Sequence, residues 1–202
     1  MSGTLEKVMS QFGKISAGAA CAASIAYGVA QILQVAGMLP TPLDRFLIFA
    51  PSLVLAPCFV LALVAACVHA SPSQRIWRFS ALSFALLYAG LVSVVYVSQL
   101  GVVLPRELSG TGTGFEIVGC CSFRQPMTVI DLLGYIYMSL AMLLLAPSFD
   151  GRLRLLLTLN GLLAIPIFLQ LFWPALIWLA APWLILFPAA MLLLAFHFHG
   201  DE

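Results

Sequence analysis

Asp131 places a carboxyl group inside an apolar segment, VIDLLGYIYM (residues 129–138). Polar side chains within such segments usually face the interior of a helix bundle, where they bind ligands, ions or protons or join neighbouring helices. Tyr135 follows one helical turn after Asp131 on the same face, and Ser139 follows a further turn along. This face is therefore the first candidate for a functional site.

Other apolar segments carry polar side chains with the same helical spacing. Gln31 and Gln34 share one face, Tyr96 and Gln99 share another, and Gln170 lies near the end of a later segment. Together with the residues above they form a candidate ligand-binding set: Gln31, Gln34, Tyr96, Gln99, Asp131, Tyr135 and Gln170.

Three functions are open for this set. The first is a binding pocket for a small lipophilic or weakly polar ligand, or for a partner protein. The second is an intramembrane enzyme acting on a lipid or isoprenoid, with Asp131 as general acid and Tyr96 and Tyr135 orienting the substrate. The third is a small transporter with Asp131 as a proton or cation site. The sequence offers neither a clear second carboxylate for an enzyme nor paired charges in several helices for a transporter, so we expect a binding protein.

A structural role for Asp131 is the alternative to a site. The residue follows Pro126 and Thr128 near the start of its predicted helix, where acidic side chains favour the positive end of the helix dipole. With Thr128 as the N-cap, TVID (residues 128–131) would be a variant of the capping box. Arg106 or Arg124 of the neighbouring loop would pair with Asp131 under either interpretation.

The composition indicates a protein dissolved in a lipid bilayer. The 202 residues are 62% hydrophobic and 8% charged, with a mean hydropathy of +1.07. Soluble domains are roughly 45–50% apolar and about 25% charged. The net charge of +1 and the lack of a basic stripe argue against a nucleic-acid partner.

Turn-forming residues divide the chain into six apolar segments. Each segment is near the roughly 20 residues that cross a membrane as a helix, and no alternating strand pattern competes. We therefore predict an all-α polytopic transmembrane bundle forming a single membrane domain (residues 1–202). The predicted helices cover residues 15–39, 46–70, 79–104, 127–149, 153–172 and 173–198, with a polar loop at 105–126.

The basic residues predict the orientation, because cytoplasmic loops of membrane proteins are enriched in lysine and arginine. One side of the membrane would hold Lys7, Lys14, Arg75, Arg78, Arg152 and Arg154, and the other Arg45, Arg106 and Arg124. We expect both termini to be cytoplasmic and the loop at 105–126 to lie outside, in a bacterial inner membrane. This orientation places the candidate set in the outer half of the bilayer, in a pocket centred on Asp131.

The cysteines do not indicate a metal site. Cys21, Cys58 and Cys67 lie in apolar segments as small hydrophobic residues. Cys120 and Cys121 are adjacent in the outer loop, where oxidation or a metal contact is open, although adjacent cysteines are awkward to bridge. Since no CxxC pair or histidine with ligand spacing accompanies them, we expect neither metal nor cofactor.

A ridge of small residues follows one face of the first predicted helix at four-residue intervals. Such ridges allow close backbone approach between membrane helices. Packing within the bundle is one use of this ridge, and a homodimer interface is the other. Its members are Ser16, Ala20, Ser24 and Gly28.

Two stretches resemble a group of uncharacterised bacterial multi-pass membrane proteins: YVSQLGVVLP (residues 96–105) and DLLGYIYMSLAMLLLAPSF (residues 131–149). In that group one helix ends in a Gln-Leu stretch and a proline, and a later helix carries Leu-Gly-Tyr, Met, Leu-Ala, Ala-Pro and Phe. LNGLLAIP (residues 159–166) extends the similarity over roughly the second half of the chain. The resemblance implies a bundle of six to seven helices and no established function. The matching residues are Gln99, Leu100, Pro105, Leu133, Gly134, Tyr135, Met138, Leu140, Ala141, Ala146, Pro147 and Phe149.

Overall fold

The computed structural model describes residues 3–111 and 117–200, and in these two ranges the regular structure is helical, with no strand. Six helices or joined helices in them are long and apolar enough to cross a membrane. The predicted all-α bundle with six apolar helices is confirmed at this level. The six candidate spans are Lys7–Val35, Leu43–Val68, Arg75–Leu108, Pro126–Ser148, Gly151–Leu169 and Pro174–Phe198.

The first half of the chain forms α1 (Gly3–Val35), α2 (Leu43–Val68) and α3 (Arg75–Ser98). Helix α1 begins well before the predicted start at residue 15. A π-helical turn, Gln99–Val103, continues α3 directly into α4 (Leu104–Leu108). The helical run therefore passes Pro105, where we predicted its end. Pro105 is tolerated because it lies in the first turn of α4, where a missing N–H costs no α-helical hydrogen bond.

The second half begins with α5 (Pro126–Leu145), which a short 3₁₀ turn, Ala146–Ser148, extends. The two remaining predicted helices are each interrupted. The fifth consists of α6 (Gly151–Leu162) and α7 (Ala164–Leu169), and the sixth contains α8 (Ile177–Ala180) and α9 (Trp183–Gly200).

Proline explains both interruptions. Pro166 cannot donate a hydrogen bond to the carbonyl of Leu162, the last residue of α6, and Pro182 lies in the turn between α8 and α9. Pro51, Pro57 and Pro188 are held inside continuous helices instead.

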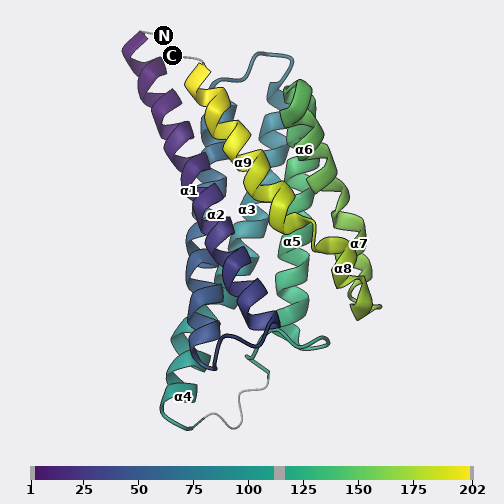
Figure 1. Ribbon diagram of the computed structural model, residues 1–202. Helices are drawn as coiled ribbons and strands as arrows, with labels where there is room; N and C mark the ends of the chain where they lie inside the picture. Colours follow the sequence, from purple (N-terminus) through teal and green to yellow (C-terminus); the bar gives the residue numbers. More distant parts are fainter. Residues whose placement is uncertain (1–2, 112–116, 201–202) are drawn as a thin grey trace.

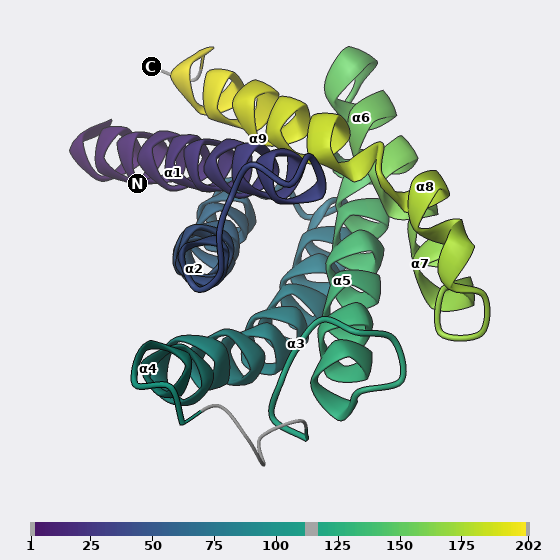
Figure 2. The ribbon, with the colours of Figure 1, turned by 60° about the horizontal axis from the view of Figure 1, so that its bottom comes forward.

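The long helices form a closed ring. In the order α1, α2, α3, α5, α6 and α9 each helix contacts the next, and α9 returns to α1. Figure 2 shows this arrangement along the bundle. The two termini lie at one end, and α4 and the segment that leads into α5 lie at the other, which we call the α4 end (Figure 1).

Small residues permit the close helix contacts of this ring. A Cβ atom on Gly134 of α5 would lie 2.5 Å from Cγ1 of Val92 in α3, and one on Gly161 of α6 would lie 2.5 Å from Cβ of Leu143 in α5. The small-residue ridge of α1 is likewise buried within the single chain, with Ser16, Ala20 and Ser24 exposing 6%, 0% and 0% of their surface. Close packing supplies the attraction that the hydrophobic effect does not provide between helices in lipid.

Candidate functional site

A cavity of about 630 Å³ lies at the α4 end of the bundle. Its walls come from the ends of α1, α3 and α7, from the beginnings of α2, α5 and α9, from α8, and from residues 120–123 of the loop before α5. Six of the seven candidate residues line it: Gln31, Gln34, Tyr96, Asp131, Tyr135 and Gln170. The grouping that the sequence predicted around Asp131 therefore exists as a cavity.

Asp131 does not cap its helix. Helix α5 begins at Pro126 after the N-cap residue Gln125, so Asp131 lies beyond the first turn. Thr128 is also inside α5, and its hydroxyl donates a hydrogen bond to the carbonyl of Ser122 at 2.8 Å. The capping-box alternative is thus wrong, because the N-cap is Gln125, three residues before Thr128.

The carboxyl group of Asp131 belongs to a polar cluster between α3 and α5. Its Oδ1 atom is buried and accepts no hydrogen bond from any residue that the structure describes. Tyr96 is its polar neighbour, and the Tyr96 hydroxyl donates to the Tyr135 hydroxyl at 3.3 Å. Because α3 and α5 pack together at Gly134, these three side chains converge on one side of the cavity.

Aromatic rings form the apolar wall next to this cluster. Trp183, at the start of α9, packs edge-on against Tyr27 and Tyr135, with centroid distances of 5.7 Å and 5.3 Å, and stacks on Phe187 at 5.0 Å. Its indole Nε1 is buried and has no hydrogen-bond partner among the described residues. The position of Trp183 in the site depends on the return of α9 to α1.

A chain of hydrogen bonds fixes the wall made by α1 and α2. The Gln31 amide donates to Oε1 of Gln34 at 3.1 Å, and the Gln34 amide donates to Oδ2 of Asp44 at 2.8 Å. Oδ1 of Asp44 accepts from the backbone N–H of Arg45, also at 2.8 Å. Asp44 was missed in the sequence because it lies just outside the predicted helix, whereas it is buried in the first turn of α2.

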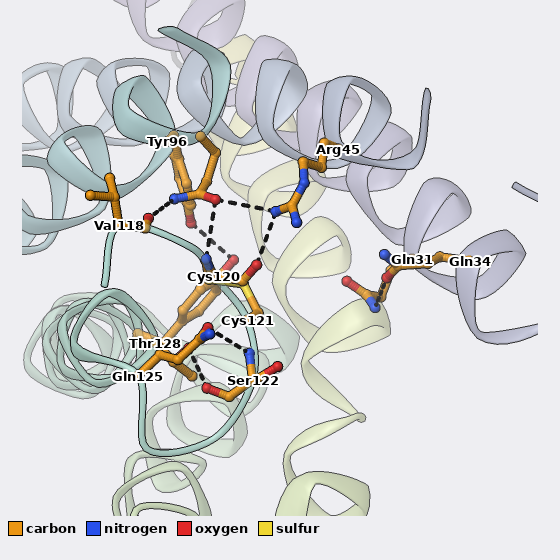
Figure 3. The surroundings of a disulfide bond; sticks show 12 residues. Gln31, Gln34, Arg45, Tyr96, Val118, Cys120, Cys121, Ser122, Gln125 and Thr128 are labelled. Atoms are coloured by element: carbon orange, nitrogen blue, oxygen red, sulfur yellow. Dashed lines mark hydrogen bonds between the residues drawn. A yellow bond between two sulfur atoms is a disulfide. The ribbon is translucent and has the colours of Figure 1, made fainter. Parts of the chain in front are cut away.

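Arg45 joins the wall to the loop (Figure 3). Its Nε lies 2.8 Å and 2.7 Å from the two carboxylate oxygens of Glu107. Its Nη1 donates to Oε1 of Gln99 and to the carbonyl of Cys120, at 3.2 Å and 3.0 Å. Arg45 is therefore the basic residue among the described lining of the cavity, and Arg106 and Arg124, which the sequence offered as partners for Asp131, are not part of that lining.

Gln99 supports the loop and is not among the described residues that line the cavity. Its side chain is fully buried in the π-helical turn. The amide oxygen accepts from the backbone N–H of Cys120 at 3.1 Å, and the amide nitrogen donates to the carbonyl of Val118 at 2.7 Å. π-Helical turns often occur at functional sites, and this one places Gln99 under the loop segment that covers the site.

Cys120 and Cys121 form a disulfide bond at the edge of the cavity (Figure 3). Cys120 is buried, whereas Cys121 is exposed. The two sulfur atoms and a carboxylate oxygen of Asp131 all lie within 4.8 Å of one another. This proximity could not be predicted from the sequence, because Asp131 belongs to a different element and its separation from the cysteines matches no common ligand spacing.

The site combines a polar interior with an apolar outer wall. Among the described lining residues the charged ones are Asp44, Arg45 and Asp131, and the charge of Arg45 is compensated by Glu107. Ile32, Val35, Ile177 and Trp178 also line the cavity and expose much of their apolar surface. Fold and site together define a helical bundle with six helices long and apolar enough to cross a membrane and an amphipathic cavity at one end.

No family model, curated protein or solved structure matches the chain. Function is therefore inferred from the geometry of the site.

Proposed function

We propose that this integral membrane protein binds a small lipophilic or weakly polar molecule in the cavity around Asp131. The observation that carries the proposal is that Asp131 lines a cavity of about 630 Å³ while its buried Oδ1 atom accepts no hydrogen bond from the described residues. Ligand pockets typically measure about 300–1,000 Å³ and combine mostly apolar walls with a few convergent polar groups.

The free acceptor indicates which polar group the ligand carries. A buried acceptor without a donor costs about 1–3 kcal/mol, so a hydroxyl or amine placed against Asp131 would recover this free energy. The apolar side chains of Ile177 and Trp178, which also line the cavity, would accompany the lipophilic part of the ligand. An amphiphile with one hydrogen-bond donor at its end therefore fits the site best.

Binding is favoured over acid–base catalysis by the state of the second carboxyl group. Asp44 is the other acidic residue among the described lining residues, but both of its oxygens are already occupied, by Gln34 and by the Arg45 backbone. An enzyme with paired carboxyl groups would require a free second partner for Asp131.

The proposed setting is a bacterial inner membrane with both termini in the cytoplasm. The basic residues near the termini, including Lys7 and Lys14, support this orientation. Since the termini and the α4 end lie at opposite ends of the bundle (Figure 1), the cavity would lie in the outer half of the bilayer.

Photo-crosslinking tests the proposal directly. The full chain in lipid nanodiscs is irradiated with a long-chain alcohol that carries a diazirine, and the labelled peptides are identified by mass spectrometry. We expect saturable labelling in the segments that line the cavity, with competition by unlabelled alcohol.

Substitutions at two neighbouring residues of α8 test whether filling the cavity blocks labelling, one of them as the control. Ala180 lines the cavity, whereas Leu179 is 60% exposed and is not among the lining residues. Ala180→Trp should reduce labelling about tenfold, which corresponds to 1.4 kcal/mol, and Leu179→Trp should leave it unchanged. Equal labelling in both variants, spread over the lipid-facing surface, would disprove a ligand pocket.

A further inference from the structure

The disulfide beside Asp131 carries an inference beyond ligand binding. We propose that, after reduction of the Cys120–Cys121 bond, the two thiolates and the Asp131 carboxylate bind a thiophilic divalent metal ion such as Zn²⁺. The sulfur atoms and the carboxylate oxygen already lie within 4.8 Å of one another.

The carboxylate oxygen lies within reach of a metal bound to the sulfur atoms, and the two bonded sulfur atoms must move apart after reduction. Zinc bonds of about 2.3 Å to sulfur and 2.0–2.2 Å to oxygen place neighbouring ligand atoms about 3.5–3.8 Å apart. Rotation of the freed cysteine side chains is sufficient to reach this spacing. Three protein ligands leave a fourth position open, as in zinc sites that hold a water molecule or an exchangeable ligand.

The types of ligand select the metal. Two thiolates favour zinc, cadmium and other soft ions over magnesium or calcium. Asp131 contributes a buried oxygen that accepts no hydrogen bond from the described residues, so metal binding at Oδ1 would break no described hydrogen bond.

The loop is held in place independently of the sulfur atoms. Gln99 accepts from the N–H of Cys120, and Arg45 donates to the carbonyl of the same residue. Both contacts are made to the main chain, so neither requires the disulfide bond. They would hold the loop next to Asp131 when the cysteines are reduced, in the supporting role that hydrogen bonds around metal ligands commonly have.

Metal binding depends on reduction because a disulfide contains no thiolate. A dithiol reductant supplies two electrons and two protons, so the S–S bond breaks to give two thiols while the reductant becomes a disulfide. The metal then displaces both thiol protons and binds the two thiolates. The oxidised protein should therefore not bind the metal at this site.

Cadmium titration of the full chain in detergent tests the site. Cys21, Cys58 and Cys67 are first replaced by alanine, so that Cys120 and Cys121 are the remaining cysteines. A phosphine reductant opens the disulfide and is itself oxidised to its oxide, with water supplying the oxygen and the two protons. We expect the thiolate-to-cadmium absorption band to rise to one equivalent in the reduced protein, to be missing in the oxidised protein, and to be reversed by Zn²⁺.

Variants identify the ligands. Cys120→Ser and Cys121→Ser should each abolish the stoichiometric band. Asp131→Asn should weaken cadmium binding about tenfold or more. Asp150→Asn should leave it unchanged, because Asp150 is exposed between α5 and α6 and lies outside both the cavity lining and the three-residue group. Unaltered affinity in Asp131→Asn, or the lack of a band in the reduced protein, would overturn the proposal.

Alkylation of the protein that retains all three metal-ligating residues provides a second test. Cadmium should protect Cys121, the exposed cysteine of the pair, from alkylation by a maleimide after reduction. Alkylation at the same rate with and without cadmium would also overturn the proposal. Neither result depends on labelling by the long-chain alcohol, which is measured on the oxidised protein.

Discussion

Asp131 differs from Asp44 and Arg45, the other charged residues among the described lining of the cavity, in its unused hydrogen-bonding capacity. The Gln34 amide and the Asp44 carboxylate satisfy each other, and Arg45 is held by Glu107. The Oδ1 atom of Asp131 is buried, and the residues that the structure describes provide it with no donor. Groups of this kind reduce stability, and a bound ligand or ion is the natural compensation.

Replacing Asp131 by asparagine separates a functional role from a structural one. Asp131→Asn preserves the shape of the side chain and removes a carboxylate whose burial costs several kcal/mol. We expect an unchanged or higher thermal unfolding temperature, followed by intrinsic tryptophan fluorescence in detergent, together with reduced alcohol labelling in nanodiscs. A decrease of about 1 kcal/mol in the free energy of unfolding, as for removal of a helix cap, together with unchanged alcohol labelling would contradict a role in binding.

The ion pair between Arg45 and Glu107 should contribute to the stability of the α4 end. Both side chains are 22% exposed, so solvent screening limits their coupling to about 1 kcal/mol. A double-mutant cycle with Arg45→Gln and Glu107→Gln, measured by thermal unfolding, provides this value. Arg45→Gln should also increase hydrogen exchange at residues 117–125, because it removes the bond to the Cys120 carbonyl. Additive effects of the two substitutions would show that the pair is not coupled.

At the scale of the elements, close helix contacts determine which polar residues meet. Helix α3 approaches α5 at Gly134, and this contact brings Tyr96 within hydrogen-bonding distance of Tyr135. Helix α6 approaches the backbone of α5 at Gly161. The interruptions near Pro166 and Pro182 allow α7 and α8 to form part of the cavity wall, which straight helices would place elsewhere.

The contact at Gly161 should be sensitive to one added methyl group. A Cβ atom there would lie 2.8 Å and 2.9 Å from the backbone Cα and N of Leu143, which cannot move aside as a side chain would. Gly161→Ala should lower stability by about 1–3 kcal/mol. Gly90 in α3 is the matched control, since its Cβ would meet nothing within 4 Å. Gly90→Ala should be neutral or stabilising by up to about 1 kcal/mol, and equal thermal unfolding of the two variants would contradict the contact.

At the scale of the whole molecule, the ring places the termini and the cavity at opposite ends. Helix α9 returns to α1 and α6, which closes the ring and brings Trp183 against Tyr27. The direction of this ring in the membrane determines from which side a ligand or a reductant reaches the cavity.

Reporter fusions determine this direction. Green fluorescent protein fused after Glu202 should fluoresce, and alkaline phosphatase at the same point should be inactive, because the basic residues predict a cytoplasmic C-terminus. Fusions after Ser109, which follows α4, should show the opposite pattern. An active phosphatase at the C-terminus would instead place the cavity on the cytoplasmic side.

The sequence by itself determined the number and class of the long helices, and it singled out Asp131 as the residue to test. Apolar length and the spacing of polar residues are local properties, so they can be read from neighbouring residues along the chain. The same local reasoning placed Pro105 at the end of a helix, although the chain continues through a π-helical turn into α4.

Only the tertiary structure decided which side chains surround Asp131 and which of them remain available to bind a ligand or metal. Arg45 meets Glu107, Gln99 supports the loop, and Cys120 and Cys121 lie beside the carboxyl group because the ring closes and the loop folds over its end. Each of these contacts joins elements whose separation in space depends on helix packing. The sequence therefore singled out Asp131, and the structure showed that this residue lines a cavity and lies beside a pair of sulfur atoms.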